Sequence, residues 1–147
     1  MHHYVNCGLD YVWLLSGFDY VATPQGRGVR IHDLDGLQRA IADRVINAPM
    51  RLRGQEVRFL RSMLDMTQES LARALGQTRA SVARWEGARD KPIPGASDRA
   101  LRLYYAAQTA DGPAVRRLAD LLRDMYEIRH GEWEERFADR HGWRPAA

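Results

Sequence analysis

The stretch LDMTQESLARALGQTRASVARWEGARDKPIP, residues 64–94, decides the fold, because it holds two short helical patterns on either side of one glycine. The hydroxyl of Thr67 suits the N-cap of a helix, and the leucines that follow it are spaced to face a core. Gly76 stands where a left-handed residue turns the chain, and Thr78 suits the N-cap of a second helix. The stretch predicts two helices joined by a tight turn, which either read DNA or pack in an ordinary core.

The second of these helices has two distinct faces. Val82 and Trp85 are three residues apart and are predicted to point inward. The other face carries Arg79, Ala80, Ala83 and Arg84. Because the major groove of DNA admits an α-helix, this face can present arginines to guanine edges and alanines to thymine methyl groups.

Apolar residues at helical spacing predict a neighbouring helix on each side, at about residues 54–65 and 94–107. A last long helix is predicted over 113–130, and its apolar stripe either joins the intramolecular core or seals a dimer. The tail from Glu132 to Ala147 is expected to add at most a turn or two of helix, and its acidic run and histidine are expected to be solvated.

The first third of the chain has a different character. Residues 9–32 are rich in Val, Tyr, Trp, Phe and Ile and are interrupted at 16–17 and 24–28, which indicates two or three short strands joined by tight turns. Asp33 suits the N-cap of a helix that follows these strands. The apolar residues predicted for the inner side of that helix are Leu34, Leu37, Ile41 and Val45.

Together these patterns predict a mainly α chain that is α+β overall. A small N-terminal β-hairpin or meander plus a helix, at residues 1–50, is followed by a five-helix helix-turn-helix domain at 51–110 and a C-terminal helical extension at 111–147. The N-terminal unit is expected to bind a partner or to mediate dimerisation.

The composition of the 147 residues limits the possible functions. The formal net charge is only +3, but residues 51–91 contain nine Arg or Lys against five Asp or Glu, which suits a phosphate backbone as well as a solvated face. A single cysteine, Cys7, excludes an internal disulfide and a C-x-x-C zinc pair. Without a signal peptide or a run of about 20 apolar residues, we expect a cytoplasmic protein with no membrane partner.

Few residues suggest a metal site, a phosphate-binding loop or a catalytic site. His2 and His3 stand near Cys7, but terminal histidines beside one cysteine are usually disordered polar residues, so no metal site is predicted. The Gly-Arg-Gly run at 26–28 lacks the features of a phosphate loop and is interpreted as a hairpin turn. With no Ser/His/Asp set on a recognisable scaffold, we expect neither an enzyme nor a bound cofactor.

The segment TQESLARALGQTRASVARWEGARDKPIP resembles the helix-turn-helix of the Cro/cI-type, or XRE, family. The similar features, within about residues 52–105, are the TQ that opens the first helix, the LA..LG before the turn, and the WEGARDKP ending. The resemblance implies DNA binding, with Trp85 as a core anchor and Glu86 as a structural residue that pairs with an Arg or caps backbone groups. Two alanines replace longer polar residues often seen on the family's reading face, so base recognition rests mainly on Arg79 and Arg84.

A wider stretch, from GQEVRFLR at 54–61 to IPGASDRALRLYY at 93–105, resembles the C-terminal DNA-binding half of MqsA/YgiT-type antitoxins. This resemblance implies a homodimer that represses its own toxin–antitoxin operon. The N-terminal half of that family carries two C-x-x-C pairs for zinc, whereas this chain has only Cys7 there. The N-terminal unit is therefore expected to bind a different toxin, to dimerise or to sense a ligand.

The sequence thus predicts a sequence-specific DNA-binding repressor that acts as an antitoxin. Its expected partners are a cognate toxin, a second copy of the chain and double-stranded DNA with a palindromic operator. Two alternatives stay open: a stand-alone regulator that senses a ligand, and a toxin-masking module with secondary DNA contact. The residues predicted to contact DNA are Gln68, Thr78, Arg79, Ala80, Ser81, Arg84, Arg89 and Lys91. Arg79 and Arg84 are assigned to base edges and Ala80 to a thymine methyl group, and the other residues are assigned to phosphates.

Overall fold

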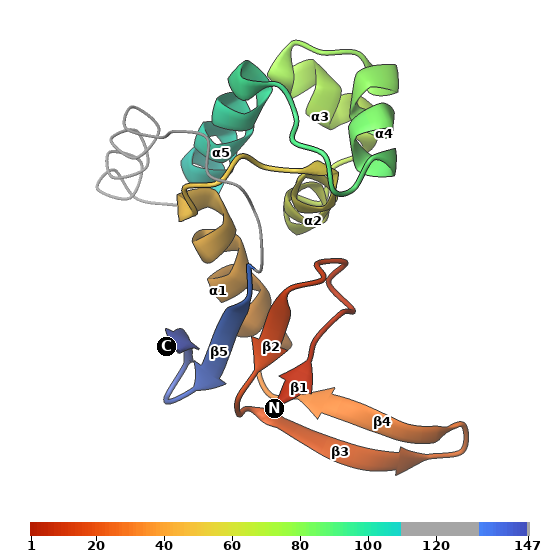
Figure 1. Ribbon diagram of the computed structural model, residues 1–147, viewed down its shortest axis with the longest axis vertical. Helices are drawn as coiled ribbons and strands as arrows, with labels where there is room; N and C mark the ends of the chain where they lie inside the picture. Colours follow the sequence, from red (N-terminus) through yellow and green to blue (C-terminus); the bar gives the residue numbers. More distant parts are fainter. Residues whose placement is uncertain (110–132, 147) are drawn as a thin grey trace. The chain divides into compact units, whose positions relative to one another are not determined.

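A computed structural model of the chain describes residues 1–109 and 133–146 (Figure 1). Within these residues the protein is a mixed α+β fold with five helices and short strands. No helix in the described part of the chain is long and apolar enough to cross a membrane. The helix predicted for residues 113–130 lies outside the described residues.

The chain divides into two compact units. Of the described residues, 1–41 and 133–146 form the first, and 42–109 form the second. Helix α1 (Leu34–Asn47) runs across this division, so the boundary predicted at residue 50 falls inside the second unit. The last turns of α1 therefore belong to the unit that contains the other helices.

The first unit is built around a four-stranded sheet in the order β1-β2-β5-β6. Its strands are β1 (His2–His3), β2 (Val12–Leu14), β5 (Glu135–Asp139) and β6 (Trp143–Ala146). The pair β2 and β5 is parallel, and the two outer pairs are antiparallel. Residues near the C-terminus of the chain thus complete a sheet that begins with its first residues.

The prediction of further helical turns in the tail is wrong, because β5 and β6 occupy that segment. Glu134 and His141 are exposed, as expected. Phe137 is fully buried, and the Trp143 indole N–H donates to the carbonyl oxygens of His32 (2.8 Å) and Asp33 (3.0 Å). Two short segments, each with one aromatic residue, lie on either side of Gly142, which adopts a φ of 119°. This pattern is typical of a hairpin. The acidic residues just before them had instead indicated a solvated face.

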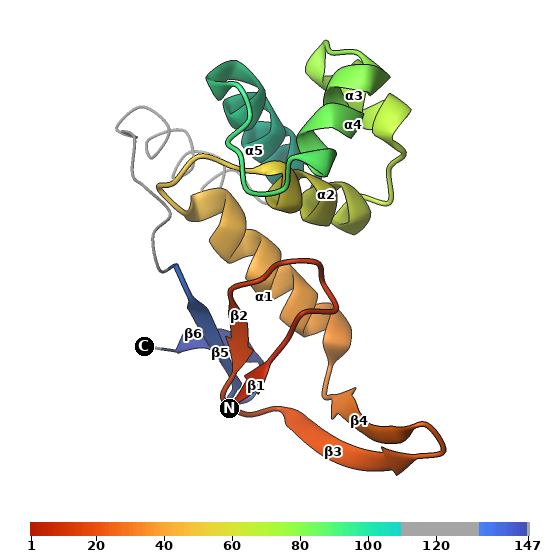
Figure 2. The ribbon, with the colours of Figure 1, turned by 45° about the vertical axis from the view of Figure 1, so that its right-hand side comes forward.

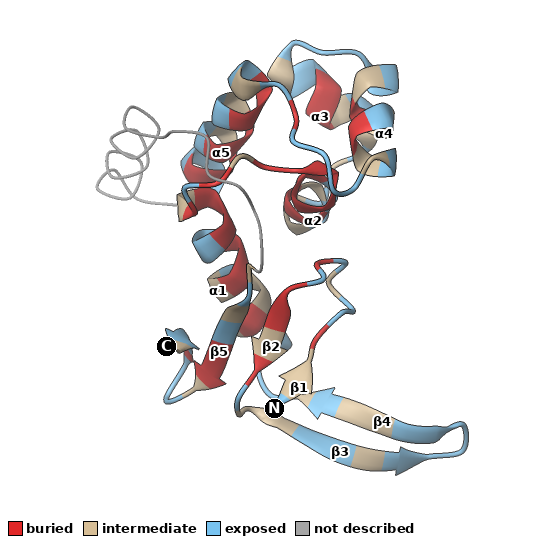
Figure 3. Ribbon diagram, in the orientation of Figure 1, coloured by how far each residue is buried: buried red, intermediate tan, exposed pale blue. Residues whose placement is uncertain are grey.

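A separate two-stranded sheet of β3 (Phe18–Thr23) and β4 (Gly26–Ile31) confirms the predicted hairpin. Residues 24 and 25 form its turn, so the interpretation of the Gly-Arg-Gly run at 26–28 as the turn is wrong, because that run lies in β4. Gly26 adopts a φ of 117°, which favours glycine, and the Thr23 hydroxyl donates to the Gly26 carbonyl oxygen at 2.6 Å. The hairpin extends away from the four-stranded sheet in both views (Figures 1 and 2). All residues of its two strands are exposed or half-buried (Figure 3).

Helix α1 begins after Asp33, as predicted. The Asp33 carboxylate accepts the backbone N–H of Gly36 at 3.1 Å, which satisfies one of the unpaired groups at the helix start. The last three apolar residues of the predicted inner side are buried, but Leu34 is 43% exposed. The predicted inner side is therefore correct only from Leu37 onward.

The second unit contains four further helices. They are α2 (Gly54–Met63), α3 (Gln68–Leu75), α4 (Arg79–Gly87) and α5 (Gly95–Thr109). Helix α4 contacts both α2 and α3, and α3 also contacts α5 (Figure 1). The helices predicted at about 54–65 and 94–107 and those predicted to begin after Thr67 and Thr78 are confirmed, with starts and ends within two residues of those predicted. The prediction of a five-helix domain at 51–110 is wrong, because the described residues of this range form four helices.

A buried ion pair within α5 makes hydrogen bonds to the end of α1 and to the segment that follows it. Arg102 and Asp98 are both fully buried, with Arg102 Nε 2.6 Å from Asp98 Oδ1. Arg102 also donates to three carbonyl oxygens between residues 46 and 50, and the second Asp98 oxygen accepts the N–H of Leu52 at 2.9 Å. These bonds satisfy polar groups whose burial would otherwise be costly.

Gly54 begins α2 at the point where the end of α4 comes closest. A Cβ atom at residue 54 would lie 1.9 Å from the Trp85 carbonyl oxygen and 3.0 Å from the Ala88 carbonyl oxygen. We expect Gly54→Ala to lower the free energy of unfolding by about 1–3 kcal/mol or more, because backbone atoms have to shift. Urea denaturation followed by circular dichroism measures the change.

Gly87→Ala is the matched control, since Gly87 ends α4 and nothing lies within 4 Å of a Cβ atom built there. Alanine is the better helix former, so this variant is expected to be as stable as the wild type or more stable by up to about 1 kcal/mol. If Gly54→Ala and Gly87→Ala had equal stability, the close approach of α2 and α4 would be disproved.

Candidate nucleic-acid interface

Local hydrogen bonds cap the starts of α3 and α4, and Gly76 forms the turn between them. Thr67 and Ser70 cap α3 reciprocally, because the backbone N–H of each donates to the hydroxyl oxygen of the other at 3.0 Å. Gly76 ends α3 in the left-handed region with a φ of 67°. Thr78 Oγ1 then accepts the backbone N–H of Ser81 at 3.1 Å and caps α4. The predicted caps and turn are confirmed.

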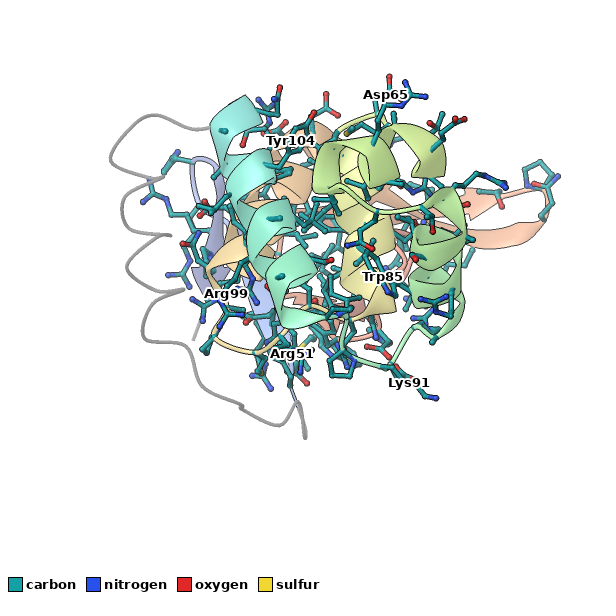
Figure 4. The ribbon with its side chains drawn as sticks, turned by 90° about the horizontal axis from the view of Figure 1, so that it is seen from above. Arg51, Asp65, Trp85, Lys91, Arg99 and Tyr104 are labelled. Atoms are coloured by element: carbon teal, nitrogen blue, oxygen red, sulfur yellow. The ribbon has the colours of Figure 1, made fainter. Side chains whose placement is uncertain are left out.

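Helix α4 has one buried side and one exposed side. Val82 is fully buried and Trp85 is 8% exposed, and Trp85 lies on the side of α4 that faces α2 (Figure 4). Arg79 and Arg84 are exposed, and their side chains make no ion pair or hydrogen bond within the part of the chain that the structure describes. Both guanidinium groups are available to an external ligand.

Small residues separate the two arginines on the exposed side of α4. Arg79 and Arg84 stand about 140° apart around the helix axis, because successive residues of an α-helix are about 100° apart. Ala80, which is exposed, and Ala83, which is half-buried, lie between them. A ligand surface can therefore come close to the middle of the helix while an arginine reaches it from each flank.

Glu86 pairs with Arg61 of α2, which confirms the predicted pairing with an arginine. Arg61 Nε and Nη2 each donate to one Glu86 oxygen at 2.8 Å, and Arg61 Nη1 donates to the Met66 carbonyl oxygen at 3.0 Å. The hydrogen bonds to Glu86 raise the pKa of the Arg61 guanidinium, so Arg61 stays charged at neutral pH. The pair holds the end of α4 against α2.

The loop after α4 is held by the start of α2. The backbone N–H groups of Gly54 and Gln55 donate to the carbonyl oxygens of Lys91 (3.3 Å) and Arg89 (3.1 Å). The Gln55 side chain also donates from Nε2 to Asp90 Oδ1 at 3.2 Å. Both cationic residues are exposed, and Lys91 extends away from the helices (Figure 4). The loop thus presents them at a defined place beyond α4.

The remaining predicted phosphate contacts lie at helix starts. Gln68 is the first residue of α3 and is half-buried. The Thr78 hydroxyl accepts from the Ser81 N–H and donates to Ser81 Oγ at 3.0 Å. The hydroxyl proton of Thr78 is therefore already in use, and Ser81 is the better phosphate donor of the two.

The histidines near the N-terminus take part in the packing of the first unit. The rings of His3 and Trp13 stack with centroids 4.3 Å apart, and His3 Nε2 lies 2.8 Å from the Asp10 carbonyl oxygen. Cys7 is half-buried, and burial raises the pKa of its thiol. Within residues 1–109 and 133–146, no group of three His, Cys, Asp or Glu side chains is arranged to hold a metal ion.

Comparison of the chain with protein-family models, curated proteins and solved structures gave no match. The residues and the geometry of α3, α4 and the loop after α4 are therefore the basis for a proposal about function. Together they form one exposed surface that carries cations and small side chains and is fixed from behind by buried residues.

Proposed function

We propose that the protein is a sequence-specific DNA-binding transcriptional regulator, in which α3 and α4 form a helix-turn-helix. The observation that supports it best is the exposed side of α4, where Arg79 and Arg84 have no partner within the described residues. Trp85 is buried on the opposite side, and the pair of Glu86 with Arg61 holds the end of α4 against α2. An α-helix held in this way fits the major groove, and the basic surplus of residues 51–91 adds attraction to phosphates.

Each exposed residue has a proposed role. Arg79 and Arg84 donate to the O6 and N7 atoms of guanines, and Ala80 packs on a thymine methyl group. The proposed phosphate contacts are Gln68, Ser81, Arg89 and Lys91. Phosphate contacts position the helix without reading sequence, so base preference depends on the two arginines of α4.

We also propose that the protein represses transcription as a homodimer on a palindromic operator. One helix-turn-helix covers few base pairs, and successive major grooves lie about 34 Å apart on one side of the duplex. The proposed role as an antitoxin rests on the resemblance of residues 54–105 to MqsA/YgiT-type antitoxins. Copurification with the product of a neighbouring reading frame separates this role from that of a stand-alone regulator.

Replacing Arg79 or Arg84 by alanine is expected to reduce the preference for the operator by about 1–3 kcal/mol at the base pair that the arginine reads. Selection from a random duplex library with the wild-type protein identifies the preferred sequence. Binding of each variant to that sequence and to single-base variants of it then measures the loss.

Arg58→Ala is the matched control, because Arg58 is an exposed arginine of α2 outside the proposed reading face. This variant is expected to keep the sequence preference of the wild type. If the Arg79 and Arg84 variants also kept it, the assigned reading face would be wrong, and if the wild type selected no sequence, the proposed function would be wrong.

A further inference from the structure

The β3–β4 hairpin contributes little to the core of the first unit. Each of its strands has six residues, and all of them are exposed or half-buried (Figure 3). An isolated two-stranded hairpin is only marginally stable in water. A hairpin that extends from a folded unit in this way is suited to contact another molecule.

The two strands of the hairpin carry two arginines and one carboxylate. Residues 20–30 contain Arg27 and Arg30 and no Asp or Glu. Asp19 is the one carboxylate in the two strands, and its Oδ2 lies 2.6 Å from His32 Nε2, near the base of the hairpin. Arg27 therefore lies near the tip with no acidic residue opposite it, whereas Arg30 lies nearer the base, opposite Asp19.

A guanidinium group lies over the exposed aromatic ring of the hairpin. The rings of Phe18 and Tyr20 have centroids 5.4 Å apart, and the ring of His2 lies 5.3 Å from the first and 5.7 Å from the second. Arg27 Cζ lies 3.6 Å from the centroid of the Tyr20 ring. This surface is thus partly covered by a cation, which suits a polyanion better than an apolar protein surface.

The shape of the hairpin also suits duplex DNA. Two-stranded β-ribbons bind in DNA grooves, and a six-residue strand spans about 20 Å. Gly26 and Gly28 flank Arg27, so the backbone at the tip can approach a sugar-phosphate chain closely. Arg27 pairs across the strands with Ala22 and Arg30 with Asp19, which places the two arginines on opposite faces of the ribbon.

We propose that the β3–β4 hairpin is a second DNA-contacting element, in which Arg27 and Arg30 bind phosphate oxygens of the duplex on the two sides of the ribbon. The proposal rests on the DNA-binding function proposed for α4. The task of the hairpin is different, however, because phosphate contacts add affinity that does not depend on sequence.

The test uses the full chain and two fluorescent duplexes of about 30 base pairs, long enough for two half-sites. One duplex carries the sequence selected by the wild type, and the other carries a scrambled sequence. Anisotropy gives the binding constant of each between about 50 and 200 mM salt. We expect Arg27→Ala/Arg30→Ala to reduce the slope of log K against log salt by about 1.8, so that the wild type loses roughly tenfold more affinity over this range.

The double variant should lose affinity for both duplexes and keep the ratio between them, whereas the α4 variants change that ratio. Arg27→Lys/Arg30→Lys should keep the wild-type slope, because phosphates also accept a point charge. Arg140→Ala/Arg144→Ala removes the same charge from exposed residues of the first unit and should change the slope less.

Two results would overturn the proposal. An equal change of slope in the two alanine double variants would mean that overall charge is responsible, and an unchanged slope in Arg27→Ala/Arg30→Ala would leave the Tyr20 surface to a protein partner. If the wild type selects no sequence, the function proposed for α4 fails, but the slopes with the scrambled duplex still decide whether the hairpin binds DNA.

Discussion

Replacing Arg102 by alanine is expected to lower the free energy of unfolding by about 3–5 kcal/mol, because it leaves a buried carboxylate without its partner. Asp98 is fully buried and lies 2.6 Å from Arg102 Nε. The variant also removes the donor to three carbonyl oxygens between residues 46 and 50. Urea denaturation followed by circular dichroism at the helical band measures the loss, which is a large part of the stability of an ordinary domain.

Two further variants show whether the hydrogen bonds of the Arg102 guanidinium group are responsible for the loss of stability. Arg99→Ala changes the exposed arginine of the same helix and is expected to stay within about 0.5 kcal/mol of the wild type. Arg102→Lys keeps the charge, but an ammonium group cannot reproduce the planar set of guanidinium donors, so we expect a substantial loss of stability here too. Wild-type stability in Arg102→Ala would show that the bonds of Arg102 do not hold residues 46–50 to α5.

Replacing Trp85 by alanine is the second substitution expected to have a large effect. The side chain is buried between α4 and its neighbours, and the loss of a buried tryptophan typically costs about 3–5 kcal/mol. Because Trp85 also fixes the orientation of α4, the variant is expected to lose both stability and preference for the selected duplex. Circular dichroism in urea measures the first, and anisotropy with the selected and scrambled duplexes measures the second.

Arg84→Ala separates the two effects, because it changes the neighbouring exposed residue. It is expected to lose sequence preference while its stability stays within about 0.5 kcal/mol of the wild type. Trp85→Phe restores part of the buried area and should lie between the alanine variant and the wild type. A Trp85→Ala protein with wild-type stability would contradict the role of Trp85 as a core anchor.

Sequence patterns predicted the helix pair well, since every signal in it is local. Thr67 and Thr78 cap helices within three residues of themselves, and Gly76 reverses the chain at its own position. The spacing of Val82 and Trp85 indicated the buried side of α4, and the structure buries both. The resemblance also gave Glu86 an arginine partner, but only the packing of α2 against α4 identifies it as Arg61.

Contacts between distant parts of the chain were not predicted. The parallel pair of β2 and β5 joins Val12 to Glu135, and no short window of sequence contains both. An arginine in a helix is ordinarily exposed, but Arg102 is buried. Its partners lie four residues away on α5 and about 50 residues earlier in the chain. Similarly, nothing around Gly54 indicates that a backbone carbonyl lies 1.9 Å from the position of a Cβ atom.

The sequence by itself determined the caps, the turn and the two faces of α4, because these depend on hydrogen bonds and spacings within a few residues. It also indicated the β3–β4 hairpin, although the turn is two residues long and the glycines predicted to form it lie in β4. Only the tertiary structure decided that the last residues complete the first sheet and that a buried arginine ties the linker to α5. The physical reason is that such contacts depend on which distant groups meet when apolar surface is buried, and local patterns do not contain that information.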